Sequence, residues 1–255
     1  MEMLSWEMLL FLIVVGFLAA FVDSVVGGGG LITVPALLFT GLPPALVLGT
    51  NKLSGTMCSL TSTASFMLSG KINFKLAAGL FPLSLIGSIL GALLVHQIPS
   101  EFLKPLVVVL LVAVTAYTLL KKNWGAASTY KGLTARSKGW LIAGAFVIGF
   151  YDGFFGPGTG SFLIFLFLLL GFDFVGASAN SKVLNLASNL GALATFFVLD
   201  SVSLAYGLPM GIAMIGGALV GTRFAIRKGA SFVKPLFVVM TIILIGKQIW
   251  SLWIS

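Results

Sequence analysis

Apolar residues fall into ten long stretches, five in each half of the chain, separated by short polar or glycine-rich segments. They cover roughly residues 4–25, 30–42, 44–70, 74–96 and 102–120, then 139–155, 158–172, 175–199, 202–226 and 232–254. Most approach the ~20 residues that a helix needs to cross a bilayer. The second stretch of each half is shorter and follows a glycine-rich segment, so it either crosses obliquely or dips in and returns. We therefore predict an all-α polytopic membrane protein with about 8–10 spans and glycine-rich helix breaks.

The composition agrees with a membrane protein. Of the 255 residues, 58% are hydrophobic and 9% are charged, and the mean hydropathy is +1.12. Soluble domains carry about 25% charged residues, so an ordinary soluble enzyme, a nucleic-acid-binding domain and a disordered scaffold are excluded. We assign the net charge of +8 to basic cytoplasmic loops and not to nucleic-acid binding. Glu2 and Glu7 stand where a signal peptide has basic residues, so we predict that the first stretch is a spanning helix.

The two halves of the chain resemble each other when the sequence is shifted by 130 positions. The matching positions include Lys104-Pro105 and Lys234-Pro235, Lys52 and Lys182, Gly87 and Gly217, Gly91 and Gly221, and, with a one-residue gap, Asp23 and Asp152. We predict a duplicated unit, with one repeat at residues 1–125 and the other at 126–255.

The basic loops indicate that the two repeats have opposite orientations. Lysine and arginine in short loops mark the cytoplasmic side of a membrane protein. Three loops are basic: the linker at 121–138, the loop at 223–234 and the loop with Lys71 and Lys75. The first-half loop that corresponds to 223–234 is not basic, and neither is the second-half loop that corresponds to the one with Lys71 and Lys75. Equivalent loops therefore face opposite sides, which requires an odd number of crossings per repeat. We predict two inverted-topology repeats of about five helical elements each, with both termini outside.

Inverted repeats are typical of secondary transporters, which bind substrate near the bilayer midplane at interrupted helices. The interruptions here run from Asp23 to Gly30 and from Asp152 to Gly160. Each precedes a helix, whose free N–H groups and positive end favour an anion. The candidate substrate-binding residues in these breaks are Gly29, Gly30, Gly158, Thr159 and Gly160. The alternative is a close glycine crossing without a ligand.

The third stretch of each half adds polar residues that a membrane helix seldom contains. Its candidate substrate-binding residues are Asn51 and Lys52 in the first half, and Asn180, Ser181, Lys182 and Asn185 in the second. A charged residue inside a span costs at least about 2.5–3.5 kcal/mol, so embedded lysines usually have a function. The alternative is that each lysine reaches the lipid headgroups. Asp23 and Asp152 could hold the lysines, cap the following helices or carry a coupling proton.

Together these groups favour transport of a small anion, with a lipid bilayer as surroundings and no nucleic-acid partner. His96 and Cys58 are the only histidine and cysteine, so we predict no metal site, no cofactor and no catalytic residues. We expect Cys58 to be a packing residue. The alternatives are an anion channel, in which the same glycines and lysines line a pore, and a non-transporting structural or assembly protein. The protein could also form a homodimer.

The paired motifs resemble a known family. They are Phe21-Val-Asp-Ser-Val-Val-Gly-Gly-Gly-Gly30 with Gly49-Thr-Asn-Lys52, and Asp152-Gly-Phe-Phe-Gly-Pro-Gly-Thr-Gly160 with Asn180-Ser-Lys-Val-Leu-Asn185. These segments are similar to the TauE/SafE family of sulfite exporters, also called the toluene-sulfonate uptake permease family, and most similar to its YfcA-like members. The resemblance implies a multi-pass protein of a bacterial or archaeal cytoplasmic membrane that moves sulfite, sulfonates or related organosulfur anions. It also implies about eight spans.

Overall fold

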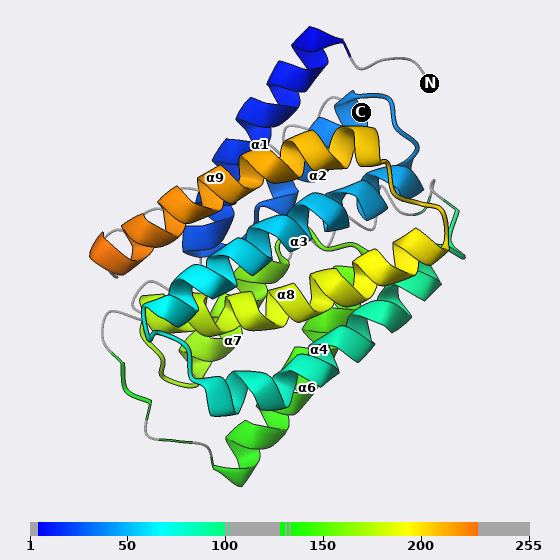
Figure 1. Cartoon of the computed structure of the whole chain (residues 1–255). Coiled ribbons are helices and arrows are strands. Elements are labelled where there is room, and N and C mark those ends of the chain that lie inside the picture. The colour runs from blue at the N-terminus through cyan, green and yellow to red at the C-terminus, as the bar shows by residue number, and fades with distance from the viewer. Residues whose placement is uncertain (1–4, 100–101, 103–127, 131, 133, 229–255) are drawn as a thin grey trace, which may run out of the picture.

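The computed structural model describes residues 5–99, 102, 128–130, 132 and 134–228, and their regular secondary structure is entirely helical. The helices are α1 (Trp6–Val26), α2 (Gly30–Phe39), α3 (Pro44–Leu68), α4 (Phe74–Val95), α6 (Ala135–Phe154), α7 (Thr159–Leu169), α8 (Phe174–Val198) and α9 (Leu204–Lys228) (Figure 1). The stretches expected at 102–120 and 232–254 lie outside the described residues, apart from Phe102.

Side chains at the helix starts explain several boundaries. Ser5, Asn73 and Asp173 each accept a hydrogen bond from a backbone N–H in the first turn of α1, α4 and α8. Thr134 and Ser137 form a reciprocal capping box. The box starts α6 at Ala135, four residues before the apolar stretch that we expected at 139–155. Such caps satisfy N–H groups that have no partner within the helix.

Six long helices lie side by side in the order α1, α9, α3, α8, α4, α6 (Figure 1). Within three neighbouring pairs, successive glycines of one helix contact successive residues of the other in the same order, so the two helices are parallel. These contacts are Gly217 and Gly221 of α9 on Phe17 and Phe21 of α1, Gly207 and Gly211 of α9 on Leu53 and Met57 of α3, and Gly87 and Gly91 of α4 on Phe146 and Phe150 of α6.

The two central helices are antiparallel. Gly49, near the start of α3, lies against Phe196 near the end of α8, and Gly55 further along α3 lies against Asn189. At the opposite end of the pair, the N–H of Asn73, just beyond α3, donates to the side chain of Asn180. Ser84 of α4 donates to the carbonyl of Leu184, and Ser88 lies further along beside Gly191, so α8 is parallel to α4. Thus α1, α3 and α9 run one way, and α4, α6 and α8 run the other.

The two short helices fold back beside the helices that precede them. Gly29 lies against Asp23 of α1, while the ring of Phe39, at the end of α2, packs 5.6 Å from that of Phe11. Likewise, Phe162 of α7 packs against Tyr151 of α6, and Leu166 lies against Gly144. With 10 and 11 residues, each short helix is about half as long as the ~30 Å hydrocarbon layer is thick. In the structure each short helix runs back along the helix before it, which favours the alternative of a half-helix that dips in and returns.

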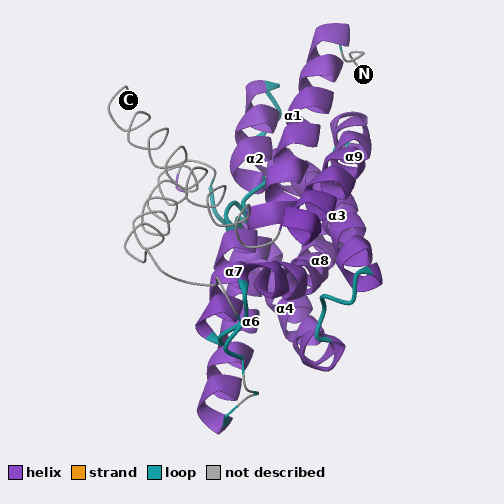
Figure 2. Ribbon diagram, turned by 90° about the vertical axis from the view of Figure 1, so that its left-hand side faces the viewer, coloured by secondary structure: helices purple, strands orange, loops and turns teal. Residues whose placement is uncertain are grey.

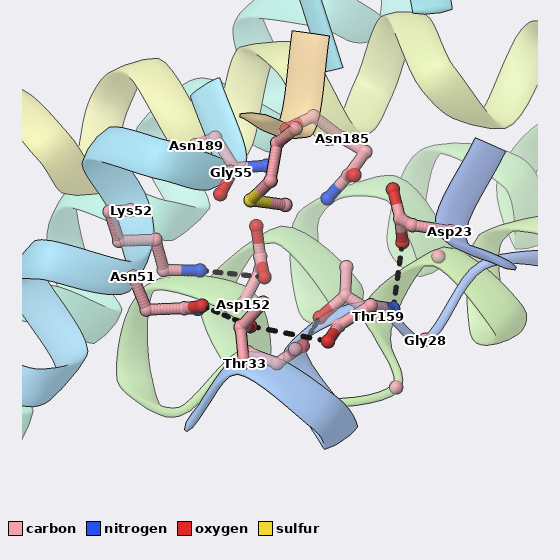
Figure 3. A pocket seen from close by; sticks show the side chains of 16 residues that line it. Asp23, Gly28, Thr33, Asn51, Lys52, Gly55, Asp152, Thr159, Asn185 and Asn189 are labelled. Atoms are coloured by element: carbon pink, nitrogen blue, oxygen red, sulfur yellow. Dashed lines mark hydrogen bonds and ion pairs between the residues drawn. The ribbon is translucent and has the colours of Figure 1, made fainter. Parts of the chain in front are cut away.

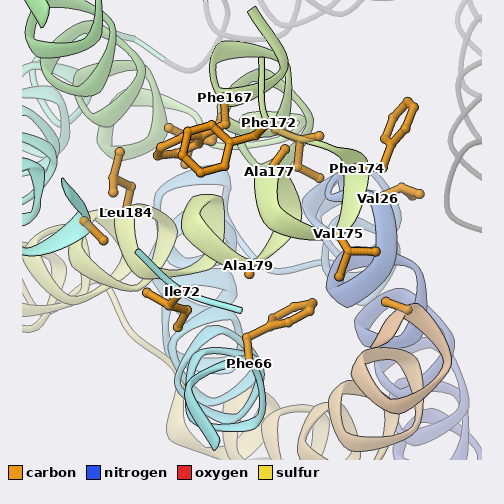
Figure 4. Packing of buried hydrophobic residues seen from close by; sticks show 14 of the residues in the cluster. Val26, Phe66, Ile72, Phe167, Phe172, Phe174, Val175, Ala177, Ala179 and Leu184 are labelled. Atoms are coloured by element: carbon orange, nitrogen blue, oxygen red, sulfur yellow. The ribbon is translucent and has the colours of Figure 1, made fainter. Parts of the chain in front are cut away.

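The length and the apolar surface of the described helices suit a lipid bilayer. Among the described helices, α1, α4 and α9 are long and apolar enough to cross a membrane on length and composition alone. Val147 and Ile212 are 60% and 63% exposed, as suits lipid-facing positions. Rings of Phe167, Phe172 and other apolar side chains fill a buried cluster between α7, the start of α8 and the end of α3 (Figure 4). The prediction of an all-α polytopic membrane protein is confirmed, while the repeat arrangement and the number of spans stay predictions.

Surface charge is distributed unevenly between the two ends of the bundle. Apart from the buried Lys52 and Lys182, every described lysine and arginine lies near the end of α3, the starts of α4 and α6, or the end of α9. These residues are Lys71, Lys75, Arg136, Lys138, Arg223, Arg227 and Lys228. Given the helix directions, all of them belong to one end, which we call the basic end. Figure 2 shows the start of α6 at this end and the start of α1 at the other. The positive-inside rule predicts that the basic end faces the cytoplasm.

The glycine contact between α4 and α6 supports a stability prediction. A Cβ at Gly91 would overlap the carbonyl oxygen of Phe150, whereas a Cβ at Gly79 on the same helix would meet no atom within 4 Å. We expect Gly91→Ala to force the helices apart and to lower the free energy of unfolding by about 1–3 kcal/mol. Gly79→Ala is the matched control and should be neutral or slightly stabilising. Thermal unfolding in detergent measures both, and equal midpoints would contradict the close packing.

Candidate functional site

Two buried ion pairs connect the two halves of the chain. Lys52 Nζ of α3 lies 2.7 Å from Asp152 Oδ1 of α6, and Lys182 Nζ of α8 lies 2.6 Å from Asp23 Oδ2 of α1. The lysine side chains are only 2% and 0% exposed, so the alternative that they reach the headgroups does not hold. Removing one partner of a buried pair leaves an uncompensated charge and typically costs 3–5 kcal/mol. Each lysine is therefore tied to the carboxylate of the opposite half.

Further hydrogen bonds hold the two carboxylates. Asp23 Oδ1 accepts a hydrogen bond from the N–H of Gly29 at the start of α2, and Asp23 Oδ2 accepts a long one from the Cys58 thiol. Asp152 Oδ2 accepts one from the hydroxyl of Ser188. The carboxylates thus hold the lysines, and Asp23 also caps the glycine break, as two of the sequence-based alternatives proposed.

A polar cavity of about 30 Å³ lies between these groups (Figure 3). Its walls are Asp23, Gly28, Gly29, Gly30, Thr33, Asn51, Lys52 and Gly55 from the first half, and Asp152, Gly156, Gly158, Thr159, Gly160, Asn185, Asn189 and Met214 from the second. This volume exceeds the ~10–15 Å³ that one water molecule needs, but it is small for a ligand of several heavy atoms.

Donor groups converge on this cavity. Lys52 and Asn51 project from α3 toward Asp152 and Thr33 (Figure 3). Asn51 Oδ1 accepts from the Thr33 hydroxyl, which leaves the Asn51 amide nitrogen for the cavity. Within the part of the chain that the structure describes, the side-chain amide of Asn185 has no hydrogen-bond partner. Two amides and an ammonium therefore face one small space.

Both glycine breaks reach the cavity and touch each other. Gly27 and Gly160 are in backbone contact that leaves no room for a Cβ at either position, and the Ser161 hydroxyl donates to the carbonyl of Val26. The starts of α2 and α7 therefore meet at the same place, from opposite ends of the bundle. Free N–H groups at a helix start, together with the helix dipole, favour a negative charge.

Two glycines make room for functional side chains. Gly156 has a φ of +98°, and a Cβ there would lie 2.7 Å from Lys52 Nζ. At Gly55, a Cβ would lie 3.1 Å from the side-chain oxygen of Asn189. Gly156 thus admits the ammonium of Lys52, and Gly55 admits the amide of Asn189.

Most of the residues expected from the sequence meet here. Those that line the cavity are Asp23, Gly29, Gly30, Asn51, Lys52, Asp152, Gly158, Thr159, Gly160 and Asn185. Asn180, Ser181 and Lys182 do not line it. Asn180 instead joins α8 to the segment before α4, Ser181 donates to the carbonyl of Ser178, and Lys182 is enclosed with Asp23.

Sequence reasoning did not select Thr33, Gly55, Gly156 or Asn189. Asn189 lies four residues beyond Asn185 and therefore on the same helical face, a signal that was available in the sequence. Gly55 and Gly156 matter because they have no side chain where a partner needs room. The partner of Gly55 is Asn189, 134 positions away, and the partner of Gly156 is Lys52, 104 positions away.

Comparison with known proteins gives a consistent result. The profile described as "Sulfite exporter TauE/SafE" matches residues 12–247. The chain is 42% identical over 245 residues to "Probable membrane transporter protein ORF9" of Sinorhizobium sp, with 96% of this chain and 93% of that protein covered. It is 36% identical to a "Probable membrane transporter protein" of Haemophilus influenzae (96% and 96% covered) and 35% identical to "Probable membrane transporter protein YfcA" of Escherichia coli K12 (93% and 88% covered). No solved structure gives a significant match.

Proposed function

The chain belongs to the TauE/SafE family of membrane transporters, and from this premise we propose that it is a secondary transporter of small anions. Its substrates are sulfite, sulfonates or other organosulfur anions, which bind between the two halves and move by alternating access. It is a multi-pass protein of a bacterial or archaeal cytoplasmic membrane, oriented with its basic end inside.

Helix directions support an inverted repeat made of residues 1–125 and 126–255. Under the 130-residue shift, α1, α3 and α4 correspond to α6, α8 and α9. Each helix runs opposite to its counterpart, and the glycine hairpin α1–α2 enters from the end opposite to α6–α7. Secondary transporters commonly have this organisation, with substrate bound where the discontinuous helices meet.

The observation that carries the proposal is the cavity in which both glycine breaks, the Lys52–Asp152 pair and the amides of Asn51 and Asn185 meet. Hydrogen-bond donors replace the water that an anion loses, and an ammonium supplies the counter-charge. The cavity has a volume of only about 30 Å³, whereas sulfite has four heavy atoms. We therefore assign the described conformation to a closed, substrate-free state that must widen to bind.

The simplest way for an anion to bind Lys52 is for the Asp152 carboxylate to leave that lysine. Lys52 is neutralised by Asp152, so an anion that binds Lys52 competes with that carboxylate. Protonation of Asp152 removes the competitor and couples the uptake of one proton to the uptake of one anion. The other charged groups nearby are Asp23, across the cavity, and its partner Lys182, while the Ser188 hydroxyl is a neutral neighbour. Lys182 does not line the cavity, so we assign the substrate contact to Lys52 alone.

Counterflow in proteoliposomes tests the proposed function. Vesicles loaded with unlabelled sulfite or methanesulfonate should accumulate the labelled anion transiently against its gradient, because a carrier exchanges substrate one for one. An anion channel would give conductance without counterflow, and a structural protein would give neither. Lactate serves as the anion without sulfur. Absence of counterflow with both sulfur anions would contradict the proposal.

Gly156 provides a prediction about the lysine position. In Gly156→Ala the new methyl group would displace the ammonium of Lys52, so we expect transport of labelled sulfite to fall at least about tenfold, the equivalent of one charge-assisted hydrogen bond. Gly41→Ala is the control, because Gly41 has a similar φ of +83° but no atom within 4 Å of the added Cβ. Both variants bear the same backbone strain. Equal transport rates in the two variants would argue against this role for Gly156.

A further inference from the structure

A second, larger cavity of about 530 Å³ lies at the basic end, between the starts of α4 and α6. Asn73, Lys75, Tyr130 and Lys138 line it together with apolar side chains that include Leu80 and Ile142. It is separate from the site described above, since the two cavities share no lining residue. The substitution proposed at Gly79 for the stability measurement also falls on its wall.

The polar side of this cavity is positively charged. Lys75 and Lys138 are exposed, and neither forms an ion pair within the described part of the chain. They lie in the first turns of α4 and α6, whose positive helix ends add to the same field. Asn73 and Tyr130 contribute an amide and a phenol to the wall. An anionic group with several oxygen acceptors matches this set.

The position of the cavity identifies the kind of anion. Phe74 and Trp140, which are 55% and 66% exposed, flank it at the starts of the same two helices, where aromatic side chains mark the membrane interface. Leu80 and Ile142 lie about one turn further along their helices, toward the hydrocarbon layer. Leu80 is already buried within the protein, but Ile142 is 40% exposed. A free anion would leave Ile142 uncovered, whereas a lipid covers it with its acyl chain.

We propose that this cavity binds an anionic phospholipid, with the phosphate between Lys75 and Lys138 and an acyl chain along the exposed side chain of Ile142. Basic pockets between membrane helices on the cytoplasmic side are known to bind such headgroups. The bound lipid would join the starts of α4 and α6, at the boundary between the two halves. This inference does not depend on which anion the protein transports.

Lipid titration of the purified full-length protein in detergent tests the inference. Phosphatidylglycerol and cardiolipin should raise the thermal unfolding midpoint and stay bound in native mass spectrometry, whereas phosphatidylcholine and inorganic phosphate should not. In Lys75→Gln/Lys138→Gln, the affinity for phosphatidylglycerol should fall at least about tenfold, because each lysine near an anionic membrane surface strengthens binding about fivefold.

Two further variants keep the test decisive. Lys71→Gln/Arg136→Gln removes the same charge from the same end without touching the cavity wall, and it should retain lipid binding. Gly79→Leu places a side chain in the cavity without changing the charge, because a Cβ at Gly79 points into open space, and it should weaken binding. The inference is overturned if both charge variants lose lipid equally, if Lys75→Gln/Lys138→Gln retains it, if Gly79→Leu leaves it unchanged, or if inorganic phosphate alone reproduces the shift.

Discussion

We expect sulfite transport to fall at least about tenfold when Lys52→Gln and Asp152→Asn are combined, and to persist when Lys182→Gln and Asp23→Asn are combined. Each double variant replaces a buried ion pair by a neutral pair of similar shape, so neither leaves a buried charge uncompensated. Only the first removes the ammonium that faces the cavity. Loss of one charge-assisted contact weakens anion binding by about 1.5–3 kcal/mol, or roughly tenfold to more than a hundredfold.

Labelled sulfite uptake into proteoliposomes measures the difference between the two double variants. Thermal unfolding of both in detergent is the control, because the comparison requires that both are folded. Equal loss of transport in two folded double variants would show that Lys182 contributes as much as Lys52, and the assignment of a single substrate lysine would then be wrong.

The second large effect is expected on the pH dependence of transport in Asp152→Asn. In the proposed mechanism an anion binds Lys52 only when Asp152 carries a proton, so binding of the anion should tighten as the pH falls. Asparagine cannot ionise and cannot compete for the lysine. The variant should therefore bind methanesulfonate with an affinity that no longer depends on pH, and a pH gradient should no longer drive uptake.

Methanesulfonate is the appropriate probe for this variant, because its charge does not change over the pH range used. Asp173→Asn is a matched control, since Asp173 caps α8 far from the cavity lining and its replacement removes one carboxylate of the same kind. The control should keep the pH dependence of the unmodified protein. A pH gradient that still drives uptake in Asp152→Asn would exclude this carboxyl as the coupling group.

Much of the fold was predictable from the sequence because apolar stretches and helix breaks are local features. The stretches expected at 44–70 and 74–96 became α3 (Pro44–Leu68) and α4 (Phe74–Val95), and both glycine segments interrupt helices as expected. Whether a short helix returns or crosses depends on the helix beside it. Contacts such as Phe39 on Phe11 decide that for α2, and hydropathy carries no information about them.

The candidate site was only partly predictable for a related reason. Residue types indicated two lysines and two aspartates, but not that Lys52 pairs with Asp152 and Lys182 with Asp23, across the halves. Helix α8 is buried on nearly all sides, so the periodicity of its polar residues could not separate Asn185, which faces the cavity, from Asn180, which does not. Helical periodicity identifies a functional face only where the other faces differ in polarity.

The most direct test of the central claim is the number of protons taken up for each anion bound at equilibrium. Calorimetric titration of the purified protein with methanesulfonate, in buffers of different ionisation enthalpy, gives this number. We expect about one proton per anion for the unmodified protein and none for Asp152→Asn. Binding without proton uptake in the unmodified protein, or equal uptake in the variant, would contradict an anion that replaces the Asp152 carboxylate at Lys52.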